Sequence, residues 1–566
     1  MTVLTKPSLC RMGGLAFLLV LGSAAWHASA QQAEYDVLIR GGRIVDGTGN
    51  PWFNGDVGIR EGRVAAIGKL ARAPAKRTID AAGLVVAPGF IDLHTHSDIP
   101  LVADGKAESK VRDGVTLDVI AEGGSVAPRD GLPVETTDGV RQDWTTFTDY
   151  FARLMKQGIS MNVISHVGAA QVRRVVMGYS DQPATPEQMD RMKKLVARSM
   201  EEGAWGMSTA FDSGGPPHPE EIIELAKVVS SYGGNYTSHI GSEGFQQEKE
   251  VGFIVRLADE AQIPVHIFHL KIRAEENWGT MQKYLDQINR ARAQGLDVTA
   301  NQYPYTAMFH GWSAFFPVWA REGGPAKFAE RLKDPAVREK IKKDPDFITW
   351  SKEHGSWGGI VMARAVTPGN KKYEGMRIAE IAKLRGDADP ADTCLQLMAE
   401  EGGRINGIFH TMSEEDVKLV MKQPWVAIAS DGSAINLDAP GVPHPRNFST
   451  NARVLGHYVR EEHVLTLEDA VRKMTSLPAQ ILGLSDRGQI HVGFAADLVV
   501  FDPAKVHETN SFERPKSYPL GIPYVLVNGV PVIDKGEHTG ARPGRVVYGH
   551  GYEGKSTLAK ATAALQ

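Results

Sequence analysis

Cysteine is nearly absent from this sequence of 566 residues, which contains only two. Cys10 lies in an amino-terminal segment that we expect to be removed, so Cys394 is the single thiol of the mature chain. A chain with one cysteine cannot form an internal disulfide. Stability must therefore come from a buried core, and a chain of this length can bury a large one.

The sequence also lacks an excess of charge of either sign. Its 63 Lys and Arg residues are balanced by 67 Asp and Glu residues, which gives a formal net charge of −4. This balance excludes binding to nucleic acid, or to an anionic membrane, by charge alone. With 42% hydrophobic and 23% charged residues, the composition is that of a globular protein rather than a disordered, collagen-like or coiled-coil chain.

Long apolar runs are missing beyond the first thirty residues. Lys6 and Arg11 precede the apolar run 13–26, and small residues follow at 28–30. A positive start, a short apolar core and small residues at the end are typical of a secretory signal peptide. We expect residues 1–30 to be cleaved and the mature protein to be exported to the periplasm, without stable membrane insertion. An uncleaved amino-terminal anchor is the alternative.

Both ends of the mature chain have the pattern of short β-strands, whereas the middle alternates between strands and helices. Residues 31–87 and 488–550 contain strand-like runs separated by turn residues, which indicates that the two segments pair into one small β-sandwich or meander. Between them, residues 88–487 alternate apolar strand-like runs with helical patterns such as 186–203 and 466–483. This alternation predicts an α/β fold with a parallel sheet, of a length that suits a (β/α)8 TIM-type barrel.

Two segments fall outside this scheme. Residues 309–365 interrupt the alternation and are rich in aromatic residues, among them Trp312, Phe316 and Trp350. An aromatic-rich insertion after a barrel strand is a candidate lid, and a packed subdomain is the alternative. Residues 551–566 are interpreted as a tail.

Two histidines mark the first candidate site. His94 and His96 follow an apolar run that begins after Pro88 and Gly89. Because residues two apart in a strand face the same way, both imidazoles are expected to point together at the end of the strand. Two imidazoles in this arrangement can bind one metal ion. A single His-x-His pair is common by chance, so the prediction depends on partners from other strands.

Further candidates lie where other strand-like runs end. They are Glu122, His239, His269 and Asp431. In barrels the chemistry gathers at the carboxyl ends of several strands, so these side chains are expected to meet His94 and His96. Any one of them, taken alone, is more often structural. His266 faces away from His269 in the same strand and is interpreted as a structural histidine.

A series of motifs runs over nearly the whole mature chain. They are VLIRGGRIVDG at 37–47, APGFIDLHTHSD at 87–98, EGAWGMST at 202–209, HIGSEG at 239–244, NQYPYTA at 301–307, SDG at 430–432 and HPR at 444–446. In order and spacing they resemble the metal-dependent amidohydrolase superfamily and, within it, the D-aminoacylase or N-acyl-D-amino-acid deacylase group. The resemblance implies a (β/α)8 barrel that carries a small β-sandwich domain formed from both the N- and C-terminal segments.

The resemblance also implies a set of metal ligands. The family's histidine ligands correspond to His94, His96, His239 and His269. Asp431 corresponds to the eighth-strand aspartate, which acts as the general base and is a candidate metal ligand. The expected cofactor is Zn²⁺, as one or two divalent ions.

One position departs from the D-aminoacylase pattern. That group has Gly-Asn-Cys-Gly, with the cysteine on the metal, where this chain has Ala121, Glu122, Gly123 and Gly124. Borderline cations accept carboxylate oxygen, so Glu122 can replace the thiolate as a ligand, and a carboxylate can also bridge two ions. An exposed turn residue is the alternative interpretation of Glu122.

The substrates of the resembled group carry a free carboxylate beside the scissile amide, which requires a cation. Arg446 is the first candidate, because a guanidinium binds a carboxylate through two hydrogen bonds. Lys271 is the second. Tyr303 and Tyr305 can donate hydrogen bonds, and His166 lies at the end of the third strand of the predicted barrel.

These residues predict an amidohydrolase that cleaves the amide bond of N-acyl amino acids, with the D configuration expected. A divalent ion activates water, and Asp431 accepts its proton. A dipeptidase of the same superfamily, acting on D- or isoaspartyl-type peptides, is the alternative. A non-catalytic scaffold is a remote alternative, because such relatives typically lose the ligands that this chain retains.

Overall fold

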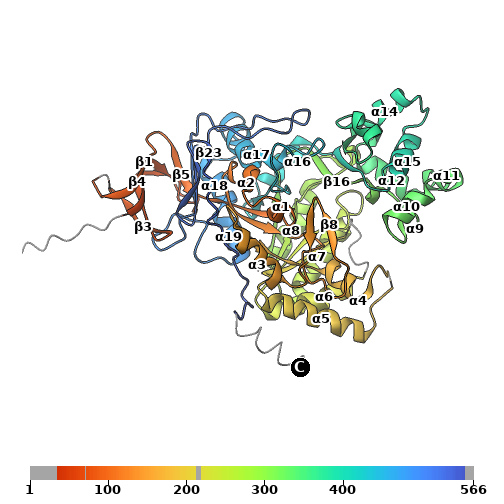
Figure 1. The fold of residues 1–566 in the computed structure, drawn as a ribbon, viewed down its shortest axis with the longest axis horizontal. Coiled ribbons are helices and arrows are strands. Elements are labelled where there is room, and N and C mark those ends of the chain that lie inside the picture. Colours follow the sequence, from red (N-terminus) through yellow and green to blue (C-terminus); the bar gives the residue numbers. More distant parts are fainter. Residues whose placement is uncertain (1–34, 71, 181, 212–217, 555–566) are drawn as a thin grey trace, which may run out of the picture.

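The computed structural model describes residues 35–70, 72–180, 182–211 and 218–554 (Figure 1). The expected signal peptide lies outside the described residues, and so does the expected tail beyond residue 554. In the described part of the chain, no helix is both long enough and apolar enough to cross a membrane.

The two ends of the described chain share one nine-stranded sheet. Its strands are β1 (Tyr35–Ile44), β2 (Phe53–Arg60), β3 (Arg63–Gly68), β4 (Ala75–Asp80), β5 (Val85–Pro88), β20 (Leu498–Phe501), β21 (Tyr524–Val527), β22 (Val530–Asp534) and β23 (Glu537–His538). The antiparallel pairing of β5 with β20 joins the two ends. Apolar side chains from both, including Ile39, Ile59 and Leu526, pack into one cluster. Neither end completes this core alone.

The middle of the chain contributes parallel strands. They are β6 (Phe90–Thr95), β7 (Val115–Ile120), β10 (Asn162–Ser165), β11 (Val167–Gly168), β12 (Gly206–Ala210), β13 (Asn235–His239), β14 (Val265–Ile267), β15 (Val298–Gln302) and β19 (Val426–Ile428). They pair in the orders β6-β7-β10 and β11-β12-β13-β14-β15-β19, and only His166 separates β10 from β11. Just beyond β19, Gly432 forms a parallel bridge with Thr95 of β6. Because each pairing is parallel, the carboxyl ends of these strands face the same side.

Helices lie between and after these strands. They include α1 (Pro100–Ala103), α2 (Glu108–Val111), α3 (Phe147–Gln157), α4 (Ala169–Met177), α5 (Pro186–Glu201), α6 (Pro219–Ser231), α7 (Gln247–Ala261), α8 (Met281–Ala293), α16 (Glu414–Met421), α17 (Arg446–Arg453), α18 (Leu467–Met474) and α19 (Ser476–Leu482). The prediction of one helix over 466–483 is wrong, because α18 and α19 are separated by Thr475, whose φ is −135°. Pro478 explains the break: it lacks an N–H donor, and its ring clashes with the carbonyl four residues earlier in a continuous helix.

The segment that interrupts the parallel strands is longer than predicted. After β15 the chain forms an antiparallel sheet of β16 (Ala307–Gly311), β17 (Ile360–Arg364) and β18 (Asn406–His410), in the order β16-β18-β17. β18 lies beyond the predicted limit at residue 365, which is therefore wrong. Local sequence patterns do not show which distant segment a strand will pair with, and the helices before β18 resemble those between the other strands.

The insertion also contains helices, which Figure 1 shows at the opposite end of the molecule from the terminal sheet. They are α9 (Val318–Arg321), α10 (Pro325–Arg331), α11 (Pro335–Lys342), α12 (Pro345–Glu353), α13 (Ser356–Gly359), α14 (Ile378–Arg385) and α15 (Pro390–Glu400). The small hairpin of β8 (Glu135–Thr137) and β9 (Val140–Gln142) follows β7.

A buried ion pair between β6 and α2 also makes hydrogen bonds to the segment just after β19. Lys110, in α2, is 2% exposed, and its Nζ lies 3.0 Å from Asp92 Oδ2. Asp92 Oδ1 accepts a hydrogen bond of 2.9 Å from the backbone N–H of Ser430, and Lys110 also donates to Ser430 Oγ. Beside this pair, the backbone N–H of Asp431 donates to His94 O at 2.9 Å. The ion pair therefore fixes two strand ends that carry candidate site residues.

We expect the substitution Lys110→Met to destabilise the protein, because it leaves the Asp92 carboxylate buried without its cation. Breaking one partner of a buried ion pair costs roughly 3–5 kcal/mol. Urea unfolding followed by circular dichroism would measure the loss. Lys106→Met is the matched control, because Lys106 is exposed in the same segment, and it should change stability by no more than about 0.5 kcal/mol. Equal unfolding curves for the two variants would contradict the assignment.

Candidate metal centre

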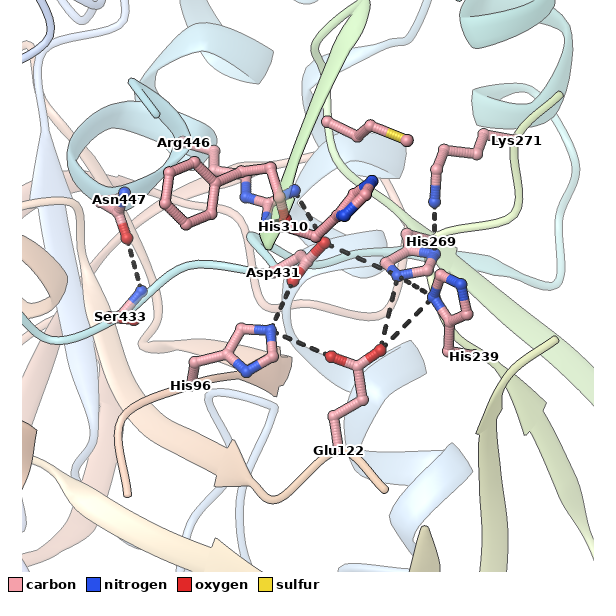
Figure 2. Close-up of a pocket in the computed structure, with 12 residues that line it drawn as sticks. His96, Glu122, His239, His269, Lys271, His310, Asp431, Ser433, Arg446 and Asn447 are labelled. Atoms are coloured by element: carbon pink, nitrogen blue, oxygen red, sulfur yellow. Dashed lines mark hydrogen bonds and ion pairs between the residues drawn. The ribbon is translucent and has the colours of Figure 1, made fainter. Parts of the chain in front are cut away.

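Side chains from separate strands converge on one point. They lie at or just beyond the carboxyl ends of β6, β7, β13, β14 and β19, and are His94, His96, Glu122, His239, His269 and Asp431. All of them except His94 line one cavity of about 220 Å³ (Figure 2). Parallel pairing explains the convergence, because it brings the ends of strands that are distant in the sequence to one side of the sheet.

The first group of candidate ligands surrounds one oxygen of Glu122. Oε2 of Glu122 lies 3.1 Å from His94 Nε2 and 3.0 Å from His96 Nε2. Asp431 Oδ1 completes this group at 2.9 Å from His96 Nε2. The ligand atoms of the group all lie within 4.8 Å of one another.

The second group surrounds the other oxygen of the same carboxylate. Oε1 of Glu122 lies 3.4 Å from His239 Nδ1 and 3.8 Å from His269 Nε2. The two imidazole nitrogens are 2.9 Å apart. Glu122 therefore belongs to both groups, and Figure 2 shows its carboxylate between His96 on one side and the pair of histidines on the other. It is not an exposed turn residue.

The two carboxylates are held in their ionised forms. Burial alone would favour the neutral acid, but the imidazoles around Glu122, His94 foremost, hold the pKa of its carboxyl well below the ordinary value. Burial also opposes ionisation of Asp431, and the adjacent Arg446 guanidinium, with the surrounding histidines, nevertheless lowers its pKa. Arg446 Nη1 lies 2.7 Å from Asp431 Oδ2.

Glu243 is a site residue that the sequence did not identify. Its side chain is 1% exposed, and its Oε1 lies 3.0 Å from His269 Nδ1 and 2.5 Å from Lys271 Nζ. The same Nδ1 lies 2.8 Å from Lys271 Nζ, so Glu243 and Lys271 together hold the ring with its Nε2 facing Glu122. Glu243 lies in the loop after β13, where no strand periodicity marks its direction, although it belongs to the motif HIGSEG.

The chain bends sharply where the ligands leave their strands. Ala121, His269 and Asp431 have φ values of 82°, 33° and 51°, in the left-handed region that residues other than glycine rarely adopt. Ala121 precedes the candidate ligand Glu122, and His269 and Asp431 are themselves candidate ligands. Backbone strain of this kind persists only where the surrounding structure fixes it, and it is concentrated at functional sites.

Three of the predicted substrate-binding residues lie together beside the ligands. Lys271 and Arg446 line the cavity, and Tyr303 lies behind them. Lys271 Nζ is 5.7 Å, and Arg446 Cζ 4.9 Å, from the centre of the Tyr303 ring. The ring therefore contacts both cations. The Tyr303 hydroxyl points to Met412 Sδ at 3.7 Å, so the phenol is not aimed at the cavity.

The other two predicted substrate-binding residues are not part of the cavity lining. Tyr305 packs edge-on against His444, and Arg453 lies over its ring. His166 is fully buried, with its Nε2 3.0 Å from Asn235 Oδ1. The predictions rested on the hydrogen-bonding capacity of Tyr305 and on the place of His166 at the end of a strand, and neither gives the direction of a side chain: the chain turns after β15, and His166 lies at the break between β10 and β11.

The cavity also contains residues that the sequence did not indicate. They are Met308, Phe309 and His310 of β16, with Ser433 and Asn447 from the segment after β19. The backbone N–H of Ser433 donates to Asn447 Oδ1 at 2.7 Å. The first three lie in β16, which pairs with the distant β18, and local sequence patterns do not show such a pairing.

The donor atoms fit a divalent cation. Nδ1 of His94 is buried and has no hydrogen-bond partner among the described residues, although buried polar atoms are nearly always satisfied. Nε2 of the same ring faces two other candidate ligands, with Glu122 Oε2 at 3.1 Å and Asp431 Oδ1 at 3.7 Å. Burial lowers the pKa of His94, which favours the neutral imidazole that binds metal. A set of imidazole nitrogens and carboxylate oxygens without thiolate suits Zn²⁺ and similar borderline ions.

Comparison with known sequences agrees with this chemistry. The model of the amidohydrolase family matches residues 77–318 and 364–533. The chain is 35% identical over 524 residues to an N-acyl-D-glutamate deacylase of Alcaligenes xylosoxydans xylosoxydans, which covers 91% of this chain and 97% of the relative. It is 34% identical over 521 residues, with the same coverage, to a D-aminoacylase of that organism.

Solved structures give the same result. A zinc and phosphonate inhibitor complex of N-acyl-D-glutamate deacylase from Bordetella bronchiseptica superposes with a TM-score of 0.77 at 30% identity, covering 91% of this chain and 100% of that one. A D-aminoacylase described as having a binuclear metal centre gives 0.77 at 31% identity, with the same coverage. L-hydantoinase from Arthrobacter aurescens, with a TM-score of 0.54 at 16% identity, shares the mixed α/β fold of TIM-barrel type alone. The chain is therefore a member of the amidohydrolase family.

Proposed function

We propose that this chain is a metal-dependent deacylase that hydrolyses the amide bond of N-acyl-D-amino acids. The position of Asp431 carries the proposal. Its Oδ1 lies 2.9 Å from His96 Nε2, among the candidate ligands, and its Oδ2 lies 2.7 Å from Arg446 Nη1. A proton acceptor thus lies between a cation site and a group that binds carboxylates. The names of the relatives, which include N-acyl-D-glutamate deacylase and D-aminoacylase, support the D configuration.

Two divalent cations, Zn²⁺ in the first instance, would be held by the two ligand groups that share Glu122. A bound divalent cation supplies Lewis acidity, which lowers the pKa of a coordinated water from ~15.7 towards ~7. The zinc complex of one relative and the binuclear centre of another support this choice.

The chain's own groups bind and orient the substrate and move the proton. Arg446 and Lys271 bind the substrate carboxylate, and the ring of Tyr303 holds the two cations in place. A substrate carboxylate that pairs with Arg446 competes with Asp431 Oδ2 for the guanidinium. Asp431 then accepts the proton of the attacking water and transfers it to the nitrogen of the leaving amine. Glu243 keeps the His269 ring in the orientation that faces Glu122.

We propose, too, that the parallel strands form a closed (β/α)8 barrel and that the terminal sheet folds into the small β-sandwich domain expected from both termini. The Thr95–Gly432 bridge and the apolar cluster of the terminal sheet support these two assignments.

Export to the periplasm after removal of residues 1–30 is a further proposal, supported by the pattern of charged, apolar and small residues in that segment. Amino-terminal sequencing of the protein from a periplasmic extract would test it.

A matched substrate panel tests the proposed activity. It contains N-acetyl-D- and N-acetyl-L-amino acids, the α-carboxamides of the D series, and D- and isoaspartyl dipeptides. We expect the D series to be hydrolysed and the L series to be poor, and the carboxamides should lose at least tenfold in kcat/KM because Arg446 has no carboxylate to bind. Cleavage of the dipeptides with N-acetyl-D-amino acids untouched would contradict the proposal and favour a dipeptidase.

The shared position of Glu122 predicts that its loss weakens both metal sites. In Glu122→Ala, the affinity for Zn²⁺ should fall at both sites by more than the roughly 10–100-fold caused by loss of a group that merely orients a ligand. Titration of chelator-treated protein by calorimetry, with elemental analysis, measures this. His269→Ala should weaken one site and spare the other. The exposed Glu276→Ala is the control. A normal metal content in Glu122→Ala would exclude Glu122 as a ligand.

The role of Asp431 predicts a separation of binding from turnover. Asp431→Asn should retain most of its bound metal but lower kcat by roughly 10²–10⁴-fold, because the amide cannot accept the proton. Steady-state kinetics with metal analysis of the same sample would show both effects. Asp438→Asn, an exposed aspartate in the same segment, should behave as the unchanged protein. Near-normal turnover in Asp431→Asn would remove this residue from the mechanism.

A further inference from the structure

A second cavity of about 330 Å³ adjoins the candidate metal centre. We call it the side cavity. It lies between the segment after β6, the segment after β19 and the sheet of the insertion, and its wall includes Ile99, Pro100, Ala363, Ile435, Val442 and Pro443. Its volume lies within the ~300–1,000 Å³ range of ligand pockets, whereas the main cavity is smaller.

The side cavity shares part of its wall with the cavity at the metal centre. Phe309, Ser433 and Asn447 line both cavities. The hydrogen bond from Ser433 N–H to Asn447 Oδ1 holds two of these shared residues together. The side cavity is therefore the neighbouring space into which a substrate bound at the ligand groups would extend past Phe309, Ser433 and Asn447.

The walls of the side cavity suit a hydrocarbon group. Among the described residues that line it, only Asp104, Asp138 and Arg364 are charged. Arg364 Nη2 forms an ion pair with Asp138 Oδ1 at 3.4 Å, and Asp104 Oδ1 accepts a hydrogen bond from the backbone N–H of Lys106. An acidic ligand would therefore meet no unpaired cation in the side cavity. An apolar group would bind there favourably, because the transfer of apolar surface out of water lowers the free energy.

The geometry of the substrate decides which of its ends enters this cavity. In an N-acyl amino acid, the carboxylate and side chain are attached to the amine end of the amide, and the acyl group lies at the opposite end of the planar trans bond. Lys271, Met308 and His310 line the main cavity alone. Figure 2 shows Lys271 on the side of His269, whereas Ser433 and Asn447 lie on the opposite side, beside His96 and Arg446. Arg446, like Lys271, lines the main cavity alone, so a carboxylate bound by these two cations stays in the main cavity, and the opposite, acyl end of the amide is the end that can reach Ser433 and Asn447.

We propose that the side cavity is the binding site for the acyl group of the substrate, and that the enzyme prefers linear, apolar acyl chains of medium length over acetyl. This inference rests on the proposed deacylase function and names its substrate class more closely. The chain enters between Phe309 and Ser433 and packs against Ile435 and Ala363.

The test compares two series of substrates on the full chain loaded with Zn²⁺. One series varies the acyl group from acetyl to octanoyl on a constant D-amino acid, and the other varies the D side chain at constant acetyl. Each buried CH₂ contributes at most about fourfold, so kcat/KM for the hexanoyl substrate should exceed that for acetyl by at least tenfold. The side-chain series should show no comparable dependence.

Variants of the side cavity locate the effect. Ile435→Asn makes the wall polar, and Ala439→Phe, a partly exposed position of the same wall, fills the cavity. Either should lower the ratio of hexanoyl to acetyl kcat/KM to within about threefold of one. The control is Leu437→Asn, which makes the same change at a residue that is 41% exposed and does not line the cavity. Its ratio should equal that of the unchanged protein.

The contrary outcomes are distinct. A flat acyl series overturns the acyl assignment, and so does a dependence that both Ile435→Asn and Leu437→Asn retain. If kcat/KM depends on length only in the series that varies the D side chain, and Ile435→Asn removes that dependence, the side cavity binds the amino-acid side chain and the acyl assignment is overturned. In all three cases N-acetyl-D-amino acids are still hydrolysed, so the proposed function stands. Absence of hydrolysis of every substrate, acetyl included, refutes the proposed function and this inference with it.

Discussion

The junction between β6 and β19 is the constraint on which the site depends. Two backbone hydrogen bonds, from Asp431 N–H to His94 O and from His96 N–H to Gly432 O, place the histidine pair opposite the aspartate. The Asp92 carboxylate, paired with Lys110, secures the same junction. A buried ion pair gains little net free energy, because desolvation offsets its attraction. Here the ion pair fixes the register of β6 relative to the segment after β19. Apolar contacts could hold the two segments together, but such contacts have no direction and would not align one residue with another.

Glu122 gives this centre a different electrostatic character from one built on cysteine. A thiolate offers one sulfur atom, whereas the two oxygens of Glu122 face separate groups, at 3.1 Å from His94 and 3.4 Å from His239. The negative charge is thereby shared between two possible cations. Because the four histidines are neutral as ligands, Glu122 and Asp431 are the charged donors, and Asp431 must balance its charge between the ligand groups and Arg446. The carboxylate that we propose as the proton acceptor is therefore also the one that contacts Arg446.

The sequence predicted those parts of the molecule that follow from short-range periodicity. Strand alternation placed His94, His239 and Asp431 at strand ends, and parallel pairing then brought them together. Strand alternation could not assign Glu243, because this residue lies in a loop. It also could not predict where the insertion ends, because β18 pairs with strands that are distant in the chain. Tyr305 was misplaced for a related reason: a motif gives the neighbours of a residue but not the direction of its side chain once the strand has ended. Pro478, which did break a helix, was a local sign that could have been used.

The candidate ligands and part of the wall of the side cavity come from different parts of the fold. The candidate ligands all come from the parallel strands, whereas Phe309 and Ala363, in the wall of the side cavity, come from the insertion sheet. The family model leaves part of the insertion unmatched, between residues 318 and 364, although it matches the strands that carry the ligands. Residues on regular strands must keep a fixed geometry to share a cation, while a separate sheet can change its side chains without moving them. The names of two relatives specify different amino acids, and in this chain we propose that the groups that distinguish substrates lie where the insertion sheet meets the segment after β19.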